Sequence, residues 1–203
     1  MHEIDSTRSR LVASPPGMKI TIIGAGNVGG ALARAWAAKG HTVTTTTSRD
    51  DIATKVETAE VVVLAVPYGA VEAVLANAGA LEGKVVIDCT NPIGVKLPDG
   101  VASGAEVLQA HVRGRVVKAF NAQGAENIST PAYGGVAATC FYCGDDAAAK
   151  QVVDGLVADV GFDPVDAGPL ASARLLEAAT LLWFGVSKAR GTRRLAFRLL
   201  REG

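Results

Sequence analysis

The chain has 203 residues, with 20 basic and 20 acidic side chains and therefore no net formal charge. This length allows one domain with a substantial core, and the balanced charge gives no indication of nucleic-acid binding. No apolar stretch approaches the length that crosses a bilayer, so we expect a cytoplasmic protein without membrane insertion. Residues 1–17 lack the apolar core of a secretory signal, and we expect them to form a disordered tail.

A strand, a glycine-rich turn, a helix and a second strand follow directly after this tail. Residues 20–23 form the first predicted strand and residues 41–47 the second. In such a turn the first glycine allows a tight bend, the second lets the backbone approach a pyrophosphate, and the third allows close packing of helix on strand. The order predicts a dinucleotide-binding unit; a nucleotide-free α/β domain with a tight first turn is the alternative. The residues of the predicted turn are Gly24, Ala25, Gly26, Asn27, Val28 and Gly29.

The end of the second predicted strand indicates which dinucleotide binds. An NAD site usually has a carboxylate there that accepts from the ribose 2′-hydroxyl, but this chain has Thr47, Ser48 and Arg49. A hydroxyl and a guanidinium suit a 2′-phosphate, so the sequence favours NADP over NAD. The alternatives are that Ser48 caps an exposed helix, or that Asp50 or Asp51 reaches the ribose.

Apolar strands and helices continue to alternate along the chain, which predicts an α/β fold of the Rossmann NAD(P)-binding type. We expect a doubly wound, mostly parallel sheet with right-handed crossovers and with helices on both faces. A long loop is predicted at residues 121–135, and a short helical segment ends the chain. Further strands are predicted at residues 61–66, 84–88, 115–120, 137–143 and 162–165, and helices at residues 67–78, 103–112, from 145 onward and at 169–189.

Ligands of such sheets bind at the carboxyl ends of the strands, where the sequence offers further candidate residues. Val66 and Pro67 follow the third predicted strand. Asn91 and Asn121 follow the fourth and fifth, and their amides either hold the nicotinamide ribose or carboxamide or form local turns. Phe120 either forms a wall for a flat ring or ends a core strand.

The cysteines of the chain are Cys89, Cys140 and Cys143. The last two form a C-x-x-C pair, but they lie in an apolar run predicted as a strand, on which positions three apart point to opposite faces. We therefore expect small buried side chains rather than a redox or disulfide pair. Because the chain has three histidines far apart in sequence, we also expect no metal site.

Six motifs in this order together resemble one family of reductases. They are the turn and helix GAGNVGGALARAWAAKGH at 24–41, TSRD at 47–50, DCTNPI at 88–93, RVVKAFN at 115–121, FYCGDDAAAK at 141–150 and GFDPVDAGPL at 161–170. The chain resembles the NADPH-dependent reductases of the deazaflavin coenzyme F420 and the wider group of dinucleotide-binding reductases around them. The cytosolic domains of certain membrane ferric reductases are similar as well.

The resemblance implies a role for each candidate residue. The glycine-rich turn holds the pyrophosphate of NADP, and Ser48 and Arg49 hold the 2′-phosphate. The two candidates after the third strand lie beside the adenine and its ribose. The three candidates after the fourth and fifth strands border the pocket in which the deazaflavin lies near the nicotinamide.

The function implied is an NADP-dependent oxidoreductase that transfers a hydride between NADP(H) and a deazaflavin or flavin acceptor. Hydride transfer between stacked rings needs positioning, so no catalytic side chain and no metal are expected. One alternative is an NADPH-binding sensor or complex subunit without turnover, and another is a flavin-linked ferric reductase. A β-hydroxyacid dehydrogenase, imine reductase or pyrroline-carboxylate reductase would need a long helical domain, for which too few residues follow Gly168.

The chain divides into an NADP-binding domain at residues 18–168 and a helical segment at residues 169–203. This segment is expected to complete the acceptor pocket or a dimer interface. Its basic end docks a partner or the anionic tail of a deazaflavin, or it forms a terminal helix with its apolar face packed and its arginines in solvent. Trp183 and Phe184 in the last predicted helix are compatible with a homodimer.

Overall fold

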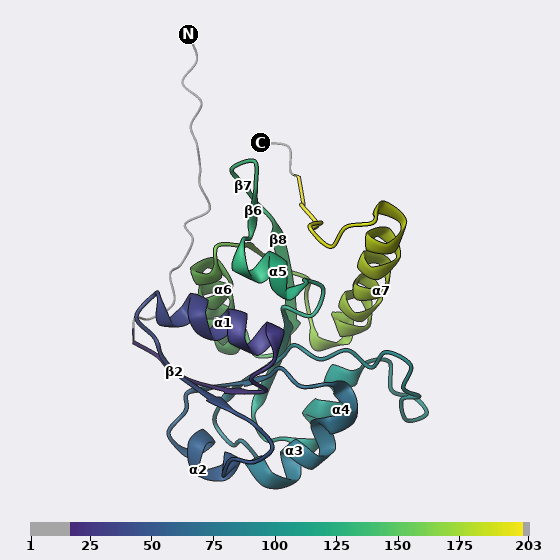
Figure 1. Ribbon diagram of the computed structural model, residues 1–203. Helices are drawn as coiled ribbons and strands as arrows, with labels where there is room; N and C mark the ends of the chain where they lie inside the picture. Colours follow the sequence, from purple (N-terminus) through teal and green to yellow (C-terminus); the bar gives the residue numbers. More distant parts are fainter. Residues whose placement is uncertain (1–16, 201–203) are drawn as a thin grey trace.

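A single seven-stranded sheet with helices on both faces forms the body of the molecule (Figure 1). This computed structural model describes residues 17–200, so the predicted tail lies outside the described residues except for its last position. In chain order the elements are β1 (Lys19–Ile23), α1 (Asn27–Ala37), β2 (Thr42–Thr46), α2 (Ile52–Glu57), β3 (Val61–Leu64), η1 (Tyr68–Ala70), α3 (Val71–Ala78), β4 (Val85–Asp88), α4 (Gly104–His111), β5 (Arg115–Ala119), α5 (Ala125–Ser129), β6 (Ala132–Tyr133), β7 (Val136–Ala137), β8 (Thr139–Gly144), α6 (Ala147–Val160), β9 (Asp163–Asp166), η2 (Leu170–Ser172) and α7 (Ala173–Arg190).

The strand order is β2-β1-β3-β4-β5-β8-β9, and the first five strands in this order are parallel. From β1 the chain moves to β2 on one side and then returns to β3 on the other. This reversal creates the crevice at the carboxyl ends of the strands where open α/β sheets bind their ligands. The predicted doubly wound, mostly parallel sheet is therefore confirmed.

One strand departs from the predicted right-handed crossovers, because β8 pairs antiparallel with β5. The connection from β5 returns along the carboxyl edge, so β8 starts at that edge and no crossover is needed. The predicted loop at residues 121–135 is not structureless, since it contains α5 and the first strand of a β6–β7 hairpin. Gly134 and Gly135 both have positive φ, as a two-residue hairpin turn requires.

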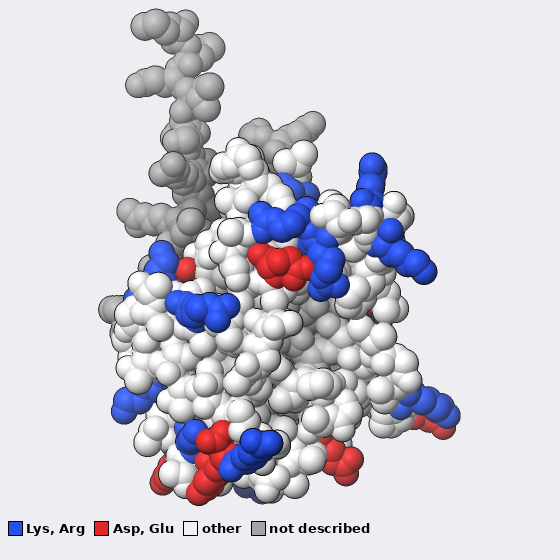
Figure 2. Space-filling model, viewed as in Figure 1, with Lys and Arg blue, Asp and Glu red and all other residues white. Residues whose placement is uncertain are grey.

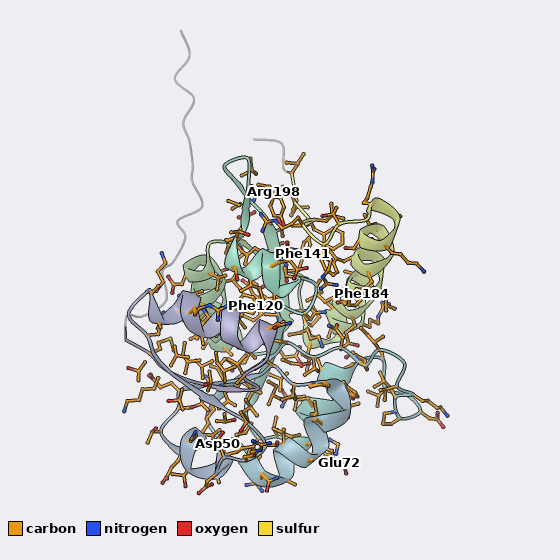
Figure 3. All side chains as sticks on the ribbon, viewed as in Figure 1. Asp50, Glu72, Phe120, Phe141, Phe184 and Arg198 are labelled. Atoms are coloured by element: carbon orange, nitrogen blue, oxygen red, sulfur yellow. The ribbon has the colours of Figure 1, made fainter. Side chains whose placement is uncertain are left out.

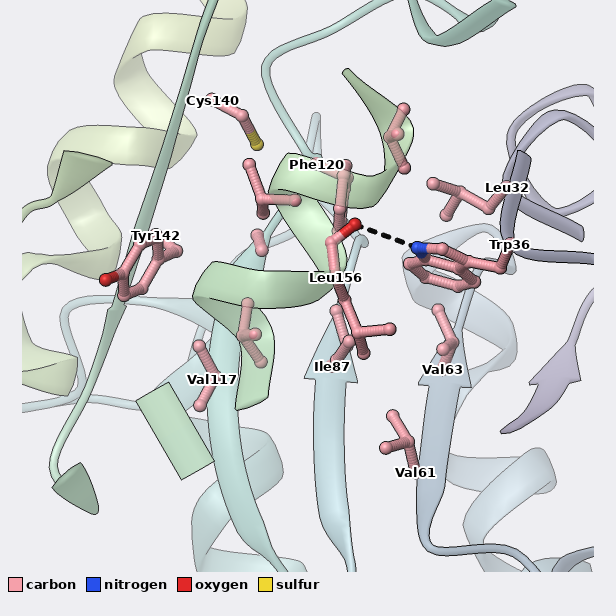
Figure 4. Close-up of a cluster of buried hydrophobic side chains, with 14 of the residues drawn as sticks. Leu32, Trp36, Val61, Val63, Ile87, Val117, Phe120, Cys140, Tyr142 and Leu156 are labelled. Atoms are coloured by element: carbon pink, nitrogen blue, oxygen red, sulfur yellow. Dashed lines mark hydrogen bonds between the residues drawn. The ribbon is translucent and has the colours of Figure 1, made fainter. Parts of the chain in front are cut away.

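Each face of the sheet carries its own apolar cluster, because alternate residues of a strand point to opposite faces. In β3, Val61 and Val63 contribute to the cluster beneath α1 and α6, whereas Val62 and Leu64 contribute to the cluster beneath α2, α3 and α4. In the first cluster the buried Trp36 donates its indole N–H to the Leu156 carbonyl at 2.9 Å (Figure 4). This bond fixes α1, which starts at the glycine-rich turn, against α6.

The antiparallel β8 and its parallel neighbour β9 determine where α7 runs. After β9 the chain is at the amino edge, so α7 crosses back toward the carboxyl edge. There Thr180 contacts Asn121, the second residue after β5, and 4 % of the Trp183 surface is exposed. The last helix thus reaches the edge where a ligand is expected.

The end of the chain differs from the predicted terminal helix. Gly191 adopts a left-handed conformation, with φ of +62°, and ends α7. The following residues are irregular and extend beside the start of β8, where Thr139 donates its N–H to the Phe197 carbonyl at 2.8 Å. The alternative of a helix that continues through the basic residues was therefore wrong, because a left-handed glycine ends the helix before them.

The expectation that no apolar stretch approaches the length that crosses a bilayer was wrong for helix α7. The segment Leu170–Arg190 has 21 residues and a mean hydropathy of 1.2, which is long and apolar enough to cross a bilayer by length and composition. One such helix is weak evidence for a membrane span, because the core helix of a soluble protein passes the same test. A third of this window is buried inside the protein. One face of α7, including Glu177, packs against the sheet, while Leu175, Leu181 and Leu182 are exposed.

Candidate functional site

The glycine-rich turn between β1 and α1 is held tightly by the protein itself at two of its glycines. Gly24 has φ of +115°, and its N–H donates to the Thr46 carbonyl at 3.0 Å. A Cβ on Gly24 would lie 2.4 Å from the Ala65 carbonyl oxygen, and a Cβ on Gly29 would lie 1.9 Å from the Gly24 carbonyl oxygen. Both positions therefore require glycine for packing, whatever binds there.

The middle glycine has a different environment. A Cβ on Gly26 would meet nothing within 4 Å, and the neighbouring Ala25 and Asn27 are exposed. Helix α1 begins here without a side-chain cap and without an acidic residue in its first turn. Its free N–H groups and the positive end of its dipole therefore face open space, which fits an anionic diphosphate.

The residues after β2 form a basic end to this surface. Ser48 and Arg49 are exposed, and within residues 17–200 the Arg49 guanidinium has no hydrogen-bond or ion-pair partner. Ser48 does not cap α2 as one alternative predicted, because Asp51 is the N-cap and accepts from the Thr54 N–H at 3.2 Å. The unpaired Arg49 guanidinium and the Ser48 hydroxyl, which caps no helix, are together suited to binding a phosphate.

Neither of the nearby carboxylates, Asp50 and Asp51, is free to bind a ribose 2′-hydroxyl as the acid of an NAD site does. Asp50 accepts from the Thr47 N–H at 2.7 Å and from the Lys55 ammonium at 2.7 Å. These bonds, that from Lys55 first, lower the pKa of Asp50 to about 2. With Asp51 used as a helix cap, both acids that could have reached a ribose are engaged locally.

The turn after β3 lies directly beside the glycine-rich turn. A Cβ on Gly24 would come within 3.1 Å of the Val66 side chain, so Val66 borders this turn. Pro67 is exposed and precedes the short helix η1. The structure therefore brings together the predicted residues from the first three strands along one edge.

Two asparagines and a threonine join the ends of β4 and β5 to α7. The Asn91 Nδ2 donates to the Asn121 carbonyl at 3.0 Å, and the Asn121 Nδ2 donates to the Asn91 Oδ1 at 2.9 Å. Thr180 Oγ1 donates to the Asn91 Oδ1 at 3.0 Å and accepts from the Asn121 Nδ2 at 3.1 Å. The two amides were expected either to hold the nicotinamide or to form local turns. In the structure they bond each other and Thr180, and so hold α7 against the ends of β4 and β5.

Phe120 occupies the core alternative of its two predicted roles. Its ring is 1 % exposed and lies 5.7 Å from the Trp36 ring and 6.5 Å from the Phe162 ring, measured between centroids. The residue has φ of +59°, a rare conformation for an aromatic residue, which turns its side chain into the core. Phe120 borders the open space at this edge, but its ring is not exposed there.

A cavity of about 370 Å³ opens at this edge, between the start of α1, the ends of β4 and β5, α5 and α7. Its size falls in the lower range of ligand pockets. Asn91, Phe120 and Asn121, the candidates for the acceptor pocket, border it together with Trp183 and Phe184. Phe184 lies on the side of α7 that faces α5 (Figure 3).

A buried ion cluster supports the cavity and was missed by sequence reasoning. The Lys118 ammonium is fully buried and lies 2.9 Å from Asp88, 2.8 Å from Glu177 and 2.6 Å from the Thr90 carbonyl. Burial alone would lower the pKa of Lys118, but the two carboxylates outweigh it and raise that pKa, so the ammonium stays charged. A lysine within an apolar strand was the available signal, but its partners are distant in sequence.

The two cysteines of the C-x-x-C pair lie on β8 with their side chains in different apolar clusters, as predicted. Cys140 belongs to the cluster beneath α1 and Cys143 to the other. Burial raises the pKa of each thiol to about 12. Both thiols are free, and they are protonated and unreactive at neutral pH.

Comparisons with known proteins show similarity to NADP-dependent reductases. The model of a family described as NADP oxidoreductase, coenzyme F420-dependent, matches residues 19–55 and 50–92. A solved structure of a proposed F420-dependent NADP reductase from Arthrobacter sp. FB24 is 32 % identical with a TM-score of 0.81, over 91 % of this chain and 100 % of that one. A hypothetical protein from Sinorhizobium meliloti is 27 % identical with a TM-score of 0.65, over 77 % of this chain and 88 % of that one.

A curated relative extends the comparison to a larger protein. The metalloreductase STEAP3 of Rattus norvegicus is 34 % identical over 127 residues, which is 62 % of this chain and 26 % of the relative. The chain thus spans about a quarter of the length of this relative. A reductive aminase from Aspergillus terreus, at 24 % identity and a TM-score of 0.64 over 86 % of this chain and 63 % of that one, shares the fold.

Proposed function

The chain belongs to the family of coenzyme F420-dependent NADP oxidoreductases, and from this premise we propose that it reduces a deazaflavin or flavin acceptor with NADPH. The nicotinamide of bound NADPH supplies the hydride. The task of the protein is then to hold two flat rings in contact and to exclude water between them. An NADP-dependent oxidoreductase of this kind needs a dinucleotide surface that continues into an acceptor cavity.

The observation that carries the proposal is the continuity of the two parts along one sheet edge. Gly26 leaves room for a diphosphate at the start of α1, and Ser48 with the unpaired Arg49 suits the 2′-phosphate. Asn27 and Val28 at the start of the same helix border the cavity. A dinucleotide that runs from Arg49 across the turn would therefore direct its nicotinamide into that cavity.

The acceptor side is suited to ring stacking rather than to proton transfer. The cavity is bordered by the amides of Asn91 and Asn121 and by the rings of Trp183 and Phe184. Aromatic rings form walls for a planar acceptor, and the amides, which bond each other and Thr180, fix the shape of the cavity around it. We assign these residues to binding and orientation of the acceptor, with residues 169–200 completing its pocket.

A second candidate function is a flavin-linked ferric reductase, which the similarity to the rat metalloreductase favours. In that case the flavin would pass electrons onward to iron. The first experiment is therefore to follow NADPH oxidation by its absorbance with coenzyme F420, FMN, FAD and ferric chelates. We expect turnover of F420 or a flavin; turnover of iron only with added flavin would identify the second candidate. Tight NADPH binding without turnover of any acceptor would contradict both and favour a sensor.

The 2′-phosphate assignment has its own test. Arg49→Gln should lower the preference for NADPH over NADH by about ten- to hundredfold, because hydrogen bonds to a charged group contribute about 1.5–3 kcal/mol. Arg113→Gln, which removes an equally charged and exposed side chain paired with Glu82, is the matched control. An unchanged cofactor preference in Arg49→Gln would show that another group binds the phosphate.

A further inference from the structure

A second cavity, of about 230 Å³, lies between α3 and α4. Both helices turn apolar side chains toward it, namely Val71, Leu75, Val107 and Leu108. Val71 is 8 % and Leu108 2 % exposed, so they form its base, whereas the other two are half-buried at its sides. None of the described residues that border this cavity also borders the acceptor cavity. This α3–α4 groove is therefore separate from the acceptor cavity.

The α3–α4 groove has the size of a compound with one ring. An apolar cavity of about 150 Å³ is enough to bind benzene. Tyr68 adds its ring to the lining, and Val95 adds its side chain from the loop between β4 and α4. The Tyr68 ring packs closely on the backbone, since a Cβ on Gly104 would lie 2.5 Å from it. The Gly104 N–H in turn donates to Glu177 at 3.1 Å, so this side of the groove is already fixed in the absence of a ligand.

The polar side chains on the α3–α4 groove are acceptors of hydrogen bonds. Glu72 is exposed, and within residues 17–200 its carboxylate has no hydrogen-bond or ion-pair partner. The His111 Nδ1 donates to the Val107 carbonyl at 2.8 Å, which leaves the Nε2 of the neutral ring as an acceptor. Among the described residues that border the groove, none is a lysine or an arginine.

The surface around Glu72 is otherwise uncharged. Glu72 lies at the lower right of the view in Figure 3, and Figure 2 shows acidic atoms in red at that place among white, uncharged atoms. An unpaired carboxylate attracts a cation, and the open face of an aromatic ring such as that of Tyr68 attracts one as well. The groove therefore combines an apolar base with a rim suited to a positively charged hydrogen-bond donor.

We propose that the α3–α4 groove is a binding site for a small apolar ammonium compound, with its ring between Leu75 and Val107 and its ammonium group on Glu72. An ammonium group carries one positive charge and three donors, which complement the carboxylate and the His111 Nε2. A neutral compound of the same shape leaves the carboxylate unused, and an anion is repelled by it. This site goes beyond the proposed function, because it lies outside the acceptor cavity and requires no hydride transfer.

The test compares three probes, 2-phenylethylamine, 2-phenylethanol and ethylamine, by titration calorimetry with NADP⁺ present. The first two differ in the charged group, and the third lacks the ring. We expect 2-phenylethylamine to bind about fivefold more tightly than the alcohol, because an ion pair at an exposed rim contributes little more than this. Ethylamine should bind at least about tenfold more weakly than 2-phenylethylamine, since it buries no ring. Equal Kd values for the amine and the alcohol would overturn the proposal.

Variants of the two helices test the position of the probe. Glu72→Gln should weaken binding of 2-phenylethylamine about fivefold and leave that of 2-phenylethanol unchanged. Glu57→Gln is the matched control, because Glu57 is an exposed acid on α2 that does not border the groove, and it should change neither Kd. Val107→Phe, which fills the groove, should abolish binding of both ring compounds. Thermal unfolding confirms that each variant is folded; tight binding to a folded Val107→Phe protein would overturn the proposal.

Backbone amide NMR shifts keep this site separate from the proposed function. With 2-phenylethylamine the shifts should change around Tyr68, Leu75 and Val107 and stay constant at Gly26 and Asn121. Changes confined to Gly26 or Asn121, or loss of amine binding when NADP⁺ is added, would place the amine at the dinucleotide or acceptor site and overturn the proposal. The measurement needs no turnover, so an absence of NADPH oxidation would contradict only the proposed function.

Discussion

The two ends of the binding edge are constructed in different ways. The dinucleotide end consists of residues close together in sequence, and its shape depends on backbone geometry at Gly24, Gly26 and Gly29. The acceptor end depends on side chains that meet only after folding, such as Lys118 with Glu177, 59 positions apart. The first end is therefore a local property of one turn, whereas the second requires that the sheet and α7 are correctly packed.

The largest expected effect is the loss of the buried lysine at the acceptor end. Lys118→Met should destabilise the protein by about 3–5 kcal/mol, because two buried carboxylates lose their shared cationic partner. Urea unfolding followed by circular dichroism measures this change. Lys150→Met is the matched control, because its pair with Asp166 is partly exposed, and it should cost about 0–1 kcal/mol. Equal losses in both variants would show that the cluster does not carry the packing of α7.

At the dinucleotide end, substitution of two glycines of the same turn by alanine should affect different properties, stability in one case and NADPH binding in the other. Gly29→Ala forces a Cβ to within 1.9 Å of the Gly24 carbonyl oxygen and should cost about 1–3 kcal/mol or more of stability. Gly26→Ala meets no atom within 4 Å and should preserve stability. It should still weaken NADPH binding by about tenfold or more, since its methyl group occupies the space of the diphosphate. Thermal unfolding and NADPH titration measure the two effects; an unchanged NADPH affinity in Gly26→Ala would move the diphosphate elsewhere.

The contrast between the two ends also explains how much the sequence could predict. The turn, its strand and the Ser48 and Arg49 pair after β2 were predicted because each depends on neighbours in sequence. The antiparallel β8 was missed because strand polarity depends on where a long connection returns, which no periodicity records. That error hid the course of α7, and with it the contacts of Lys118 and Thr180. The role of Phe120 also stayed open, because its positive φ decides which way the ring points and the sequence pattern does not record that angle.

A smaller effect is expected where the asparagine pair meets α7. Thr180→Val removes the hydroxyl that bonds Asn91 and Asn121 but keeps the side-chain shape, and should cost about 1 kcal/mol. Because the glycine-rich turn is held independently, the KM for NADPH should stay unchanged while turnover of the acceptor falls. Steady-state kinetics with each substrate varied in turn separates the two. A rise in the KM for NADPH alone would mean that the two ends are not independent.

The smallest expected effect concerns the thiols of β8, which report on the two cores separately. Burial raises the pKa of Cys140 and Cys143 from the ordinary 9.0 to about 12, so neither thiol reacts with a disulfide reagent in the folded protein near neutral pH. Below an ordinary thiol pKa of about 9, both states are protonated and the shift has no effect on stability. As pH rises from about 9 toward 12, only the unfolded thiols ionise, so the free energy of unfolding should fall by about 1.4 kcal/mol per thiol and pH unit.

Single-cysteine variants turn this protection into a local measurement. With Cys89 and Cys143 replaced by serine, Cys140 alone reports on the core beneath α1; with Cys89 and Cys140 replaced, Cys143 alone reports on the core that packs against the start of α7. If the acceptor end depends on Lys118, the Lys118→Met variant should label Cys143 faster than Cys140, because the core next to α7 opens first. Equal acceleration at both thiols would mean that the sheet opens as one unit, and that the two ends differ in construction but not in stability.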